Sequence, residues 1–405
     1  TTGIQNVLIG GLAGDALTDA DLNVAIGMEA LTSDTLGSRS TAVGYNALAV
    51  QNFTTATNTY NTAVGFQAGA AVTTAVNNTL IGALAGDALT TGNENVAVGF
   101  EALSTEDGHG GNVALGSAAL KTQNAGTTAF NTGLGYNAGL SVTTGSQNTL
   151  VGGLAGDALT TGGQNVAVGY DALGAETTSA NNVAIGREAL KTQNGATNNV
   201  ALGRTAGSAV TTGSSNCFFG KDAGDSTTSG SSNICIGQNA NNSAATGSHA
   251  IVIGHDISGS GNDFSFGKAS NIVSNTFDAN ANWSRSSDQR LKKNIVDSTL
   301  GLSFINALRP VKYNWKPSNE LDSTDSQLAH LYKEDPADNE MNTTVTMHNF
   351  LAQEVKAALD AAGVSDFSGW SEDAHGVQQV SREMFVIPLI KAVQELTARV
   401  AALES

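Results

Sequence analysis

The sequence predicts a mainly β protein: a trimeric β-solenoid shaft (a β-roll or β-helix) with a 17-residue repeat, then a small α+β domain that ends in a trimeric coiled-coil helix. Three observations predict this fold. A glycine recurs every 17 residues through most of residues 1–255. All four prolines lie beyond residue 286. Apolar residues near the C-terminus follow a heptad pattern.

The repeat unit reads Asn-x-Ala-[Ile/Val/Leu]-Gly-x-x-Ala-[Leu/Gly]. The spacing of its glycine is 17 residues except for 21 between Gly44 and Gly65 and 19 between Gly116 and Gly135. Such regularity is typical of a solenoid. Fifteen coils at about 4.8 Å each predict a rod roughly 70 Å long. The glycines are Gly10, Gly27, Gly44, Gly65, Gly82, Gly99, Gly116, Gly135, Gly152, Gly169, Gly186, Gly203, Gly220, Gly237 and Gly254.

Each position of the unit has an expected role. The residue before the glycine is aliphatic or Phe, as at Ile9, Leu115 and Phe219. Because strand residues alternate faces, we expect it to point into the coil. The preceding Ala or Gly would let another chain approach, so three chains should pack through this small-residue face. The glycine should adopt a turn closed to residues with a Cβ, and the Asn should form ladders and bond turn amides.

Charge and hydropathy exclude two classes of partner. The formal charge of −17 divides into −11 over residues 1–286 (8 basic, 19 acidic) and −6 over residues 287–405 (11 basic, 17 acidic). An acidic surface on both parts argues against nucleic acid, which attracts Lys and Arg. No stretch approaches 18 apolar residues, so we expect no membrane insertion. Because the chain starts inside a repeat, we expect an N-terminal docking part to be missing from it.

The residue that follows the glycine is the best candidate for receptor contact, because it varies most. Aromatic residues there would stack on sugar rings, and basic ones would meet acidic polysaccharide. The alternative is that the aromatics cover seams between chains and the basic residues offset nearby acids. The two longer spacings insert residues at 49–60 and 121–130, which adds Phe53, Tyr60 and Phe130 as candidates. The candidates directly after the repeat glycine are Tyr45, Phe66, Phe100, Tyr136, Tyr170, Arg187, Arg204 and Lys221.

Other reactive side chains predict no cofactor and no metal site. Cys217 and Cys235 are one residue off the repeat, so they should face opposite sides of neighbouring coils and form no disulfide. His249 and His255 flank a predicted strand, but their spacing matches no common zinc pattern. The acidic residues repeat too regularly for the single carboxylate pair of a glycosidase. Residues 256–286 are expected to form a neck or connector.

Four stretches of the C-terminal part carry a family resemblance. In order they are Ser287-Asp288-Gln289-Arg290-Leu291-Lys292-Lys293-Asn294-Ile295, Gly301 to Trp315, Phe350 to Val355, and Ile387 to Leu396. With these stretches, residues 287–405 resemble the intramolecular chaperone at the end of phage endosialidases, tailspikes and tail fibres. The repeats of residues 1–255 resemble the head repeats of trimeric autotransporter adhesins and some phage fibre shafts.

The chaperone resemblance implies self-cleavage at the Ser286–Ser287 bond. Ser287 would attack the carbonyl of Ser286 and Lys292 would take its proton, with Asp288 and Arg290 in support. A lysine acts this way only if burial or nearby charge lowers its pKa. On the residues alone, Ser287 and Asp288 would instead cap a helix that begins near Gln289. Single-turnover cleavage is the one activity implied, and no multi-turnover activity is expected in the shaft.

A C-terminal helix over residues 384–405 is expected to form a three-stranded coiled coil. Its apolar positions alternate in steps of three and four residues. Two heptads are short for a free coiled coil, so the globular part should help to hold the helices. The seam residues are Val386, Leu389, Val393, Leu396, Val400 and Leu403.

These patterns together predict a phage tail fibre that binds a host surface receptor, expected to be a glycan. It would be a homotrimer, made in the host cytoplasm, placed in the virion and joined to a tail or baseplate component. One alternative is a bacterial surface adhesin, although this chain ends in soluble Leu403-Glu404-Ser405 rather than a membrane barrel. Another is a depolymerising tailspike, for which the repeat offers no catalytic carboxylate cluster.

Overall fold

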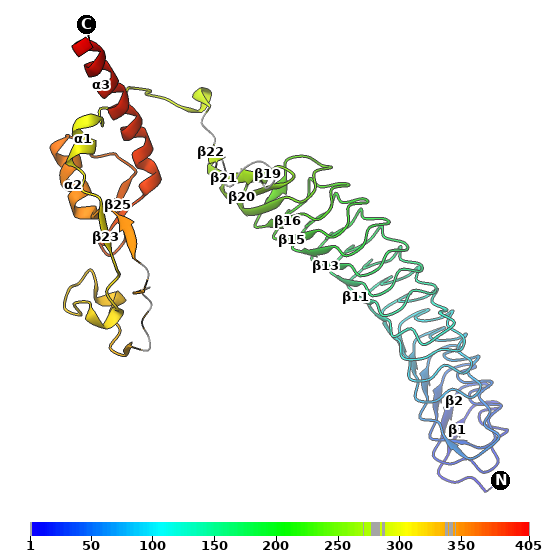
Figure 1. Cartoon of the computed structure of the whole chain (residues 1–405). Helices are drawn as coiled ribbons and strands as arrows, with labels where there is room; N and C mark the ends of the chain where they lie inside the picture. Colours follow the sequence, from blue (N-terminus) through cyan, green and yellow to red (C-terminus); the bar gives the residue numbers. More distant parts are fainter. Residues whose placement is uncertain are drawn as a thin grey trace. The chain divides into compact units, whose positions relative to one another are not determined.

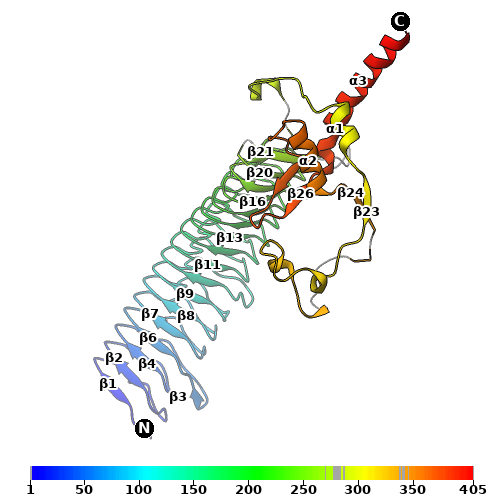
Figure 2. The same ribbon diagram turned by 90° about the vertical axis from the view of Figure 1, so that its left-hand side faces the viewer.

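The chain folds into two compact units, residues Thr1–Ser286 and Ser287–Ser405. The computed structural model describes residues 2–269, 271–276, 284–285, 288–336, 339, 343–344 and 346–404. The first unit is a β-solenoid whose short strands stack in parallel, and the second is a small α+β domain (Figures 1 and 2).

The solenoid is built from one three-residue strand per coil, because each repeat has a short apolar stretch between its Asn and its Gly. Each strand pairs in parallel with the strand of the next coil. The strands are β1 (Val7–Ile9), β2 (Val24–Ile26), β4 (Thr41–Val43), β6 (Thr62–Val64), β7 (Thr79–Ile81), β8 (Val96–Val98), β9 (Val113–Leu115), β10 (Thr132–Leu134), β11 (Thr149–Val151), β12 (Val166–Val168), β13 (Val183–Ile185), β14 (Val200–Leu202), β15 (Cys217–Phe219) and β16 (Ile234–Ile236).

The side-chain directions in these strands are the reverse of the prediction. The middle residue points inward, so that Ala25, Leu80 and Phe218 are fully buried. The residue before the glycine lies on the outer face instead, and Ile9 and Leu115 keep 58% and 44% of their surface exposed. Each strand contributes one inward residue, mostly Ala, and turn residues such as Leu31 and Leu173 fill the rest of the interior. The small-residue positions are therefore occupied by the coil's own core and cannot form a contact between chains.

The glycine and the alanine of the unit have the roles expected of them. Gly152 has a φ of +133°, and an added Cβ would lie 2.5 Å from the carbonyl oxygen of Gly169 in the next coil. Only glycine fits where two backbones approach so closely. Three residues later, Ala155 is fully buried.

A ladder of buried asparagines runs along the solenoid. Asn165 shows the pattern: its Oδ1 accepts the backbone N–H of Asn182 in the next coil at 3.0 Å. Its Nδ2 donates to the carbonyl oxygen of Ser179 at 2.9 Å, and its own N–H donates to Oδ1 of Asn148 at 3.0 Å. Each side chain thus joins two coils and closes a turn, as the sequence predicted. The same contacts recur at Asn61, Asn78, Asn131, Asn148, Asn182, Asn199 and Asn216.

Asn165→Ala is therefore expected to destabilise the solenoid by roughly 2–4 kcal/mol, because it leaves a buried N–H and a buried carbonyl without partners. Gln164→Ala is the matched control, since this neighbouring side chain is exposed. Chemical denaturation of both variants measures the difference. Equal midpoints for the two variants would show that the ladder contributes nothing.

The parallel ladder continues beyond the regular repeats and then ends in an antiparallel cap. Strand β18 (Ile251–His255) pairs in parallel with β20 (Asp263–Lys268) through a shorter coil. β21 (Asn271–Thr276) runs antiparallel to β20, and β22 (Ser284–Arg285) runs antiparallel to β21. Two small side ladders pair β3 (Gly37–Ser38) with β5 (Thr57–Asn58) and β17 (Asn241–Asn242) with β19 (Ser258–Gly259).

The C-terminal unit is a small α+β domain. Its helices are α1 (Leu302–Ala307), α2 (Ala352–Ala361) and α3 (Val386–Glu404). Where the structure describes this unit, its strands form two antiparallel pairs: β23 (Val311–Tyr313) with β24 (Met347–Asn349), and β25 (Trp370–Glu372) with β26 (Gln378–Val380). Short 3₁₀ turns cover Gln289–Leu291 (η1), Ser318–Glu320 (η2), Ala329–Leu331 (η3) and Arg382–Phe385 (η5).

Apolar side chains from α1, α2 and the 3₁₀ turn η5 form the core of this domain. Phe304 of α1 stacks on Phe385 of η5 with 6.2 Å between ring centroids, and Val355 of α2 is fully buried beside them. The carboxylate of Glu395 on α3 accepts the backbone N–H of Leu302 at 2.8 Å. This contact fixes α1 against the long helix α3.

Candidate functional sites

The junction segment begins with a capped 3₁₀ turn. Asp288 precedes η1, and its Oδ1 accepts the backbone N–H of Arg290 at 2.8 Å. Its other oxygen pairs with the Arg290 guanidinium at 2.6 Å. This hydrogen bond with Arg290 lowers the pKa of Asp288 below its usual value. Asp288 therefore has the capping role that the residues alone suggested.

The structure describes Lys292 but not its predicted partner, so the predicted dyad stays a prediction. Ser286 and Ser287 lie outside the described residues. Lys292 follows η1 and is exposed. Arg290 pairs with Asp288, so the negative charge of Asp288 offsets the positive charge of Arg290 near Lys292.

The candidate receptor residues form a row along one corner of the solenoid. Four of them, Phe66, Phe100, Tyr136 and Tyr170, keep 51–62% of their surface exposed. They occupy alternate coils, because the same position holds Ala83, Ser117 and Gly153 in the coils between them. At the start of the row, Tyr45 and Phe66 occupy adjacent coils and stack at 5.5 Å between ring centroids.

The basic end of the row is paired with acids. Arg187 contacts Glu188 at 3.2 Å, and Lys221 contacts Asp222 at 3.2 Å. Arg204 contributes to lowering the pKa of Asp222, after the larger effects of Thr205 and Lys221. These pairs agree with the alternative in which basic residues offset local acids, and they weaken the case for an acidic polysaccharide here.

The two insertions place their aromatic residues differently. Phe53 is buried, so its assignment as a receptor contact is wrong. The inserted segment folds back on the coil through the pairing of β3 with β5, and the N–H of Phe53 donates to Asp34 at 3.2 Å. Tyr60 and Phe130 are exposed, at 55% and 61%.

The two cysteines form no disulfide with each other, although they lie on paired strands. Cys217 is half-buried on the outer strand face, whereas Cys235 is buried inside the coil, and both are free thiols. Burial raises the pKa of the Cys235 thiol to about 12. His255 ends β18 and contacts Asp256 at 3.0 Å, and His249 is exposed in the turn before that strand.

The predicted seam of the C-terminal helix points away from its own domain. All six seam residues of α3 keep 45–87% of their surface exposed, from Val400 at the low end to Leu403 at the high end. The buried residues of the helix, Pro388 and Ala392, lie on a neighbouring side of it. Helix α3 thus presents an unpartnered apolar face in the single chain.

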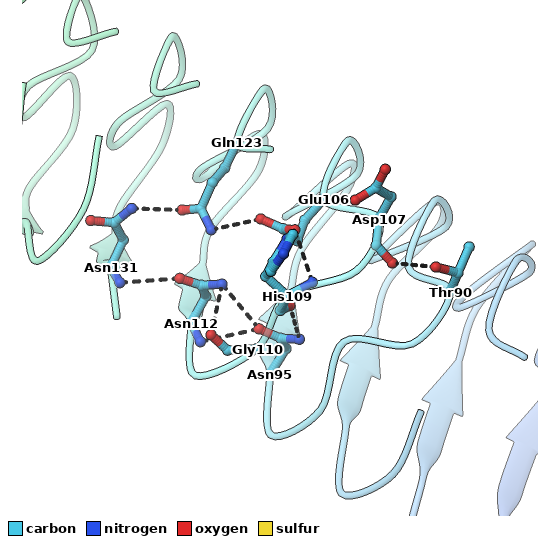
Figure 3. Close-up of polar contacts among 9 residues, drawn as sticks. All are labelled: Thr90, Asn95, Glu106, Asp107, His109, Gly110, Asn112, Gln123 and Asn131. Carbon is cyan, nitrogen blue, oxygen red and sulfur yellow. Dashed lines mark hydrogen bonds and ion pairs between the residues drawn. The ribbon is translucent and has the colours of Figure 1, made fainter. Parts of the chain in front are cut away.

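Three buried carboxylates were missed by the sequence analysis. Asp34, Glu106 and Glu176 are fully buried. Each accepts a hydrogen bond from the amide of a glutamine 17 residues later, namely Gln51, Gln123 and Gln193. Figure 3 shows the Glu106 example, where Asp107 and His109 lie beside it. The repeated acid-to-glutamine spacing of 17 is the pattern that could have identified these pairs.

Comparison with known families places the C-terminal unit. Residues 287–364 match the family model described as chaperone of endosialidase. The C-terminal unit contains an endosialidase-type chaperone domain. Such domains act in trimeric proteins and are typical of phage tail fibres and tailspikes. The matched range starts at Ser287, and it ends before helix α3.

No curated protein and no solved structure matches the chain. Over the described residues, no helix is long and apolar enough to cross a membrane.

Proposed function

We propose that the chain is a trimeric phage tail fibre whose solenoid shaft attaches to a host surface glycan. The chaperone domain sets the three-chain register and then detaches by cleavage before Ser287. The observation that carries this proposal is the combination of an endosialidase-type chaperone with a solenoid whose strand ladder keeps an exposed apolar outer face.

The outer strand face is where the three shafts would pack. Its residues are Val, Ile, Leu, Thr or Phe in nearly every coil, and Leu134, Leu202 and Ile253 are 39–44% exposed. Burying one half-exposed aliphatic side chain contributes roughly 1 kcal/mol, and the row repeats in every coil. A threefold arrangement of three such faces buries them all.

A terminal chaperone would fix the register between the three shafts, which the outer strand face cannot fix by itself. Neighbouring coils present almost the same residues, so a slip by one coil would bury a nearly identical surface. The exposed seam of α3 is a different surface that three chains can join in one register. Fixing three helices at one end would therefore align the shafts before they pack.

The aromatic row is the best candidate for the glycan contact. Phe66, Phe100, Tyr136 and Tyr170 are separated by two coils each, or about 9.6 Å. This is close to the length of a disaccharide in an extended β-linked chain. A glycan lying along the shaft would place one sugar ring of every disaccharide on an aromatic side chain, and the small residues between would leave room for the other ring.

Tyr136→Ala is expected to weaken binding to the recognised polysaccharide at least about tenfold, a loss of roughly 1.4 kcal/mol. Met28→Ala is the matched control, because Met28 occupies the same coil position and is 51% exposed but lies outside the alternating aromatic part. A glycan array probed with the trimeric fibre measures both. Loss of binding in neither variant would assign the aromatics to seams between chains.

A further inference from the structure

One coil of the solenoid differs from its two structural counterparts in a way that concerns metal binding. The turn after each buried carboxylate reads Asp34-Thr35-Leu36-Gly37, Glu106-Asp107-Gly108-His109 or Glu176-Thr177-Thr178-Ser179. Only the middle turn has both a carboxylate and an imidazole at the second and fourth positions. The other two turns have Thr followed by Gly or Ser there.

The counterparts show what the carboxylate does without such neighbours. Oε1 of Glu176 accepts the backbone N–H groups of Thr177, Thr178 and Ser179 at 2.9–3.1 Å. Oδ1 of Asp34 likewise accepts the N–H of Gly37 at 3.0 Å. In both cases the carboxylate closes its own turn through backbone amides.

At Glu106 an imidazole joins this arrangement. Oε1 accepts the backbone N–H of His109 at 3.1 Å and lies 3.2 Å from its Nδ1. One atom each from Glu106, Asp107 and His109 can be chosen so that all three lie within 4.8 Å of one another. A separation near 3.2 Å is also what two ligands show around one ion with bonds of about 2.0–2.1 Å.

The residues around the cluster hold these groups in place. The second oxygen of Glu106 accepts a hydrogen bond from Nε2 of Gln123 at 3.1 Å, and Oε1 of Gln123 accepts one from Asn131 at 2.9 Å (Figure 3). The carbonyl oxygen of Asp107 accepts the Thr90 hydroxyl at 2.7 Å. Outer partners of this kind orient metal ligands and raise affinity.

We propose that Glu106, Asp107 and His109 bind one first-row divalent cation per chain, with Zn²⁺ the best fit. Zinc binds both imidazole nitrogen and carboxylate oxygen, and three protein ligands leave its fourth position for water. Ca²⁺ fits poorly, because it takes six to eight oxygen ligands. His109 also lines a hollow of about 390 Å³ with Asn93, Glu94 and Phe130.

The proposal is independent of glycan binding and of cleavage. The metal is tested on the full chain, stripped with a chelator and titrated with Zn²⁺ in a calorimeter. We expect one Zn²⁺ per chain. The Asp107→Thr, His109→Ser double variant restores the pattern of Thr177 and Ser179, and it should weaken binding at least about a hundredfold while thermal unfolding shows a folded shaft.

His249→Ser with His255→Ser is the matched control and should leave the stoichiometry and affinity unchanged. The proposal is overturned if the Asp107 and His109 double variant binds Zn²⁺ as the unmodified chain does. It is equally overturned if the stripped chain takes up no Zn²⁺, or if the His249 and His255 control abolishes binding.

Discussion

Ser287→Ala is expected to leave the chain at its full 405 residues, whereas the unmodified chain should yield a shaft fragment of 286 residues. In the proposed reaction, Oγ of Ser287 attacks the carbonyl carbon of Ser286, and the C–N bond between the two residues breaks. The released amine gains a proton, and water then hydrolyses the ester. Without the hydroxyl, the first bond cannot form.

Lys292→Ala should have the same all-or-none effect, because Lys292 is the proposed base. Intact-mass analysis of freshly expressed protein measures both variants. Ser286→Ala and Lys293→Ala are the controls and should still be cut. Persistence of the 286-residue fragment in both the Ser287 and Lys292 variants would exclude this pair.

The surroundings of Lys292 in the single chain bear on when cleavage before Ser287 should occur. Lys292 is exposed, and the charge of Arg290 is offset by Asp288. A lysine becomes a base only where burial or nearby positive charge lowers its pKa. We therefore expect cleavage to follow association of the three chains, which would bring further groups around the junction.

Leu389→Asp combined with Leu396→Asp is expected to abolish the trimer and leave the shaft misassembled or aggregated. Both side chains lie on the exposed seam of α3. Each trimer would then carry six carboxylates where six apolar side chains should pack, and each such side chain contributes about 1.5–3 kcal/mol when buried. The same variant should remain uncut.

Gln394→Asp is the control, because it adds one carboxylate to an exposed position of α3 that lies off the seam. Sedimentation velocity measures the mass of both proteins. A trimer of normal mass in the Leu389 and Leu396 variant would place the joining surface elsewhere.

The sequence predicted the solenoid well, because its regular positions have single physical solutions. Gly152 and Asn165 are examples: only glycine fits the backbone contact, and only a side-chain amide both donates and accepts across coils. The direction of the strand residues was predicted wrongly. In a three-residue strand, either the middle residue or the two outer residues can point inward. The larger aliphatic residues were expected inside, but leucines of the turns, such as Leu173, already fill that space.

The sites were harder to predict than the fold. Phe53 was assigned to the surface because an insertion usually projects, but hydrogen bonding to Asp34 holds its segment inward. The cluster of Glu106 and His109 was missed because a single acid in a turn does not stand out in the sequence. Only its separation of 17 residues from a glutamine marks it as buried. The roles of Ser287 and Lys292 rest on the family resemblance and stay predictions.

The two native cysteines allow a direct test of the claim that three shafts pack through their outer strand faces. Cys217 lies on the outer strand face, where the three shafts are proposed to meet, and Cys235 lies inside its own coil. A short bifunctional maleimide, applied at low protein concentration, should give covalent dimers with the unmodified chain and with Cys235→Ser. Cys217→Ser should give none. Covalent dimers that persist in Cys217→Ser, or their absence from Cys235→Ser, would contradict packing through this face.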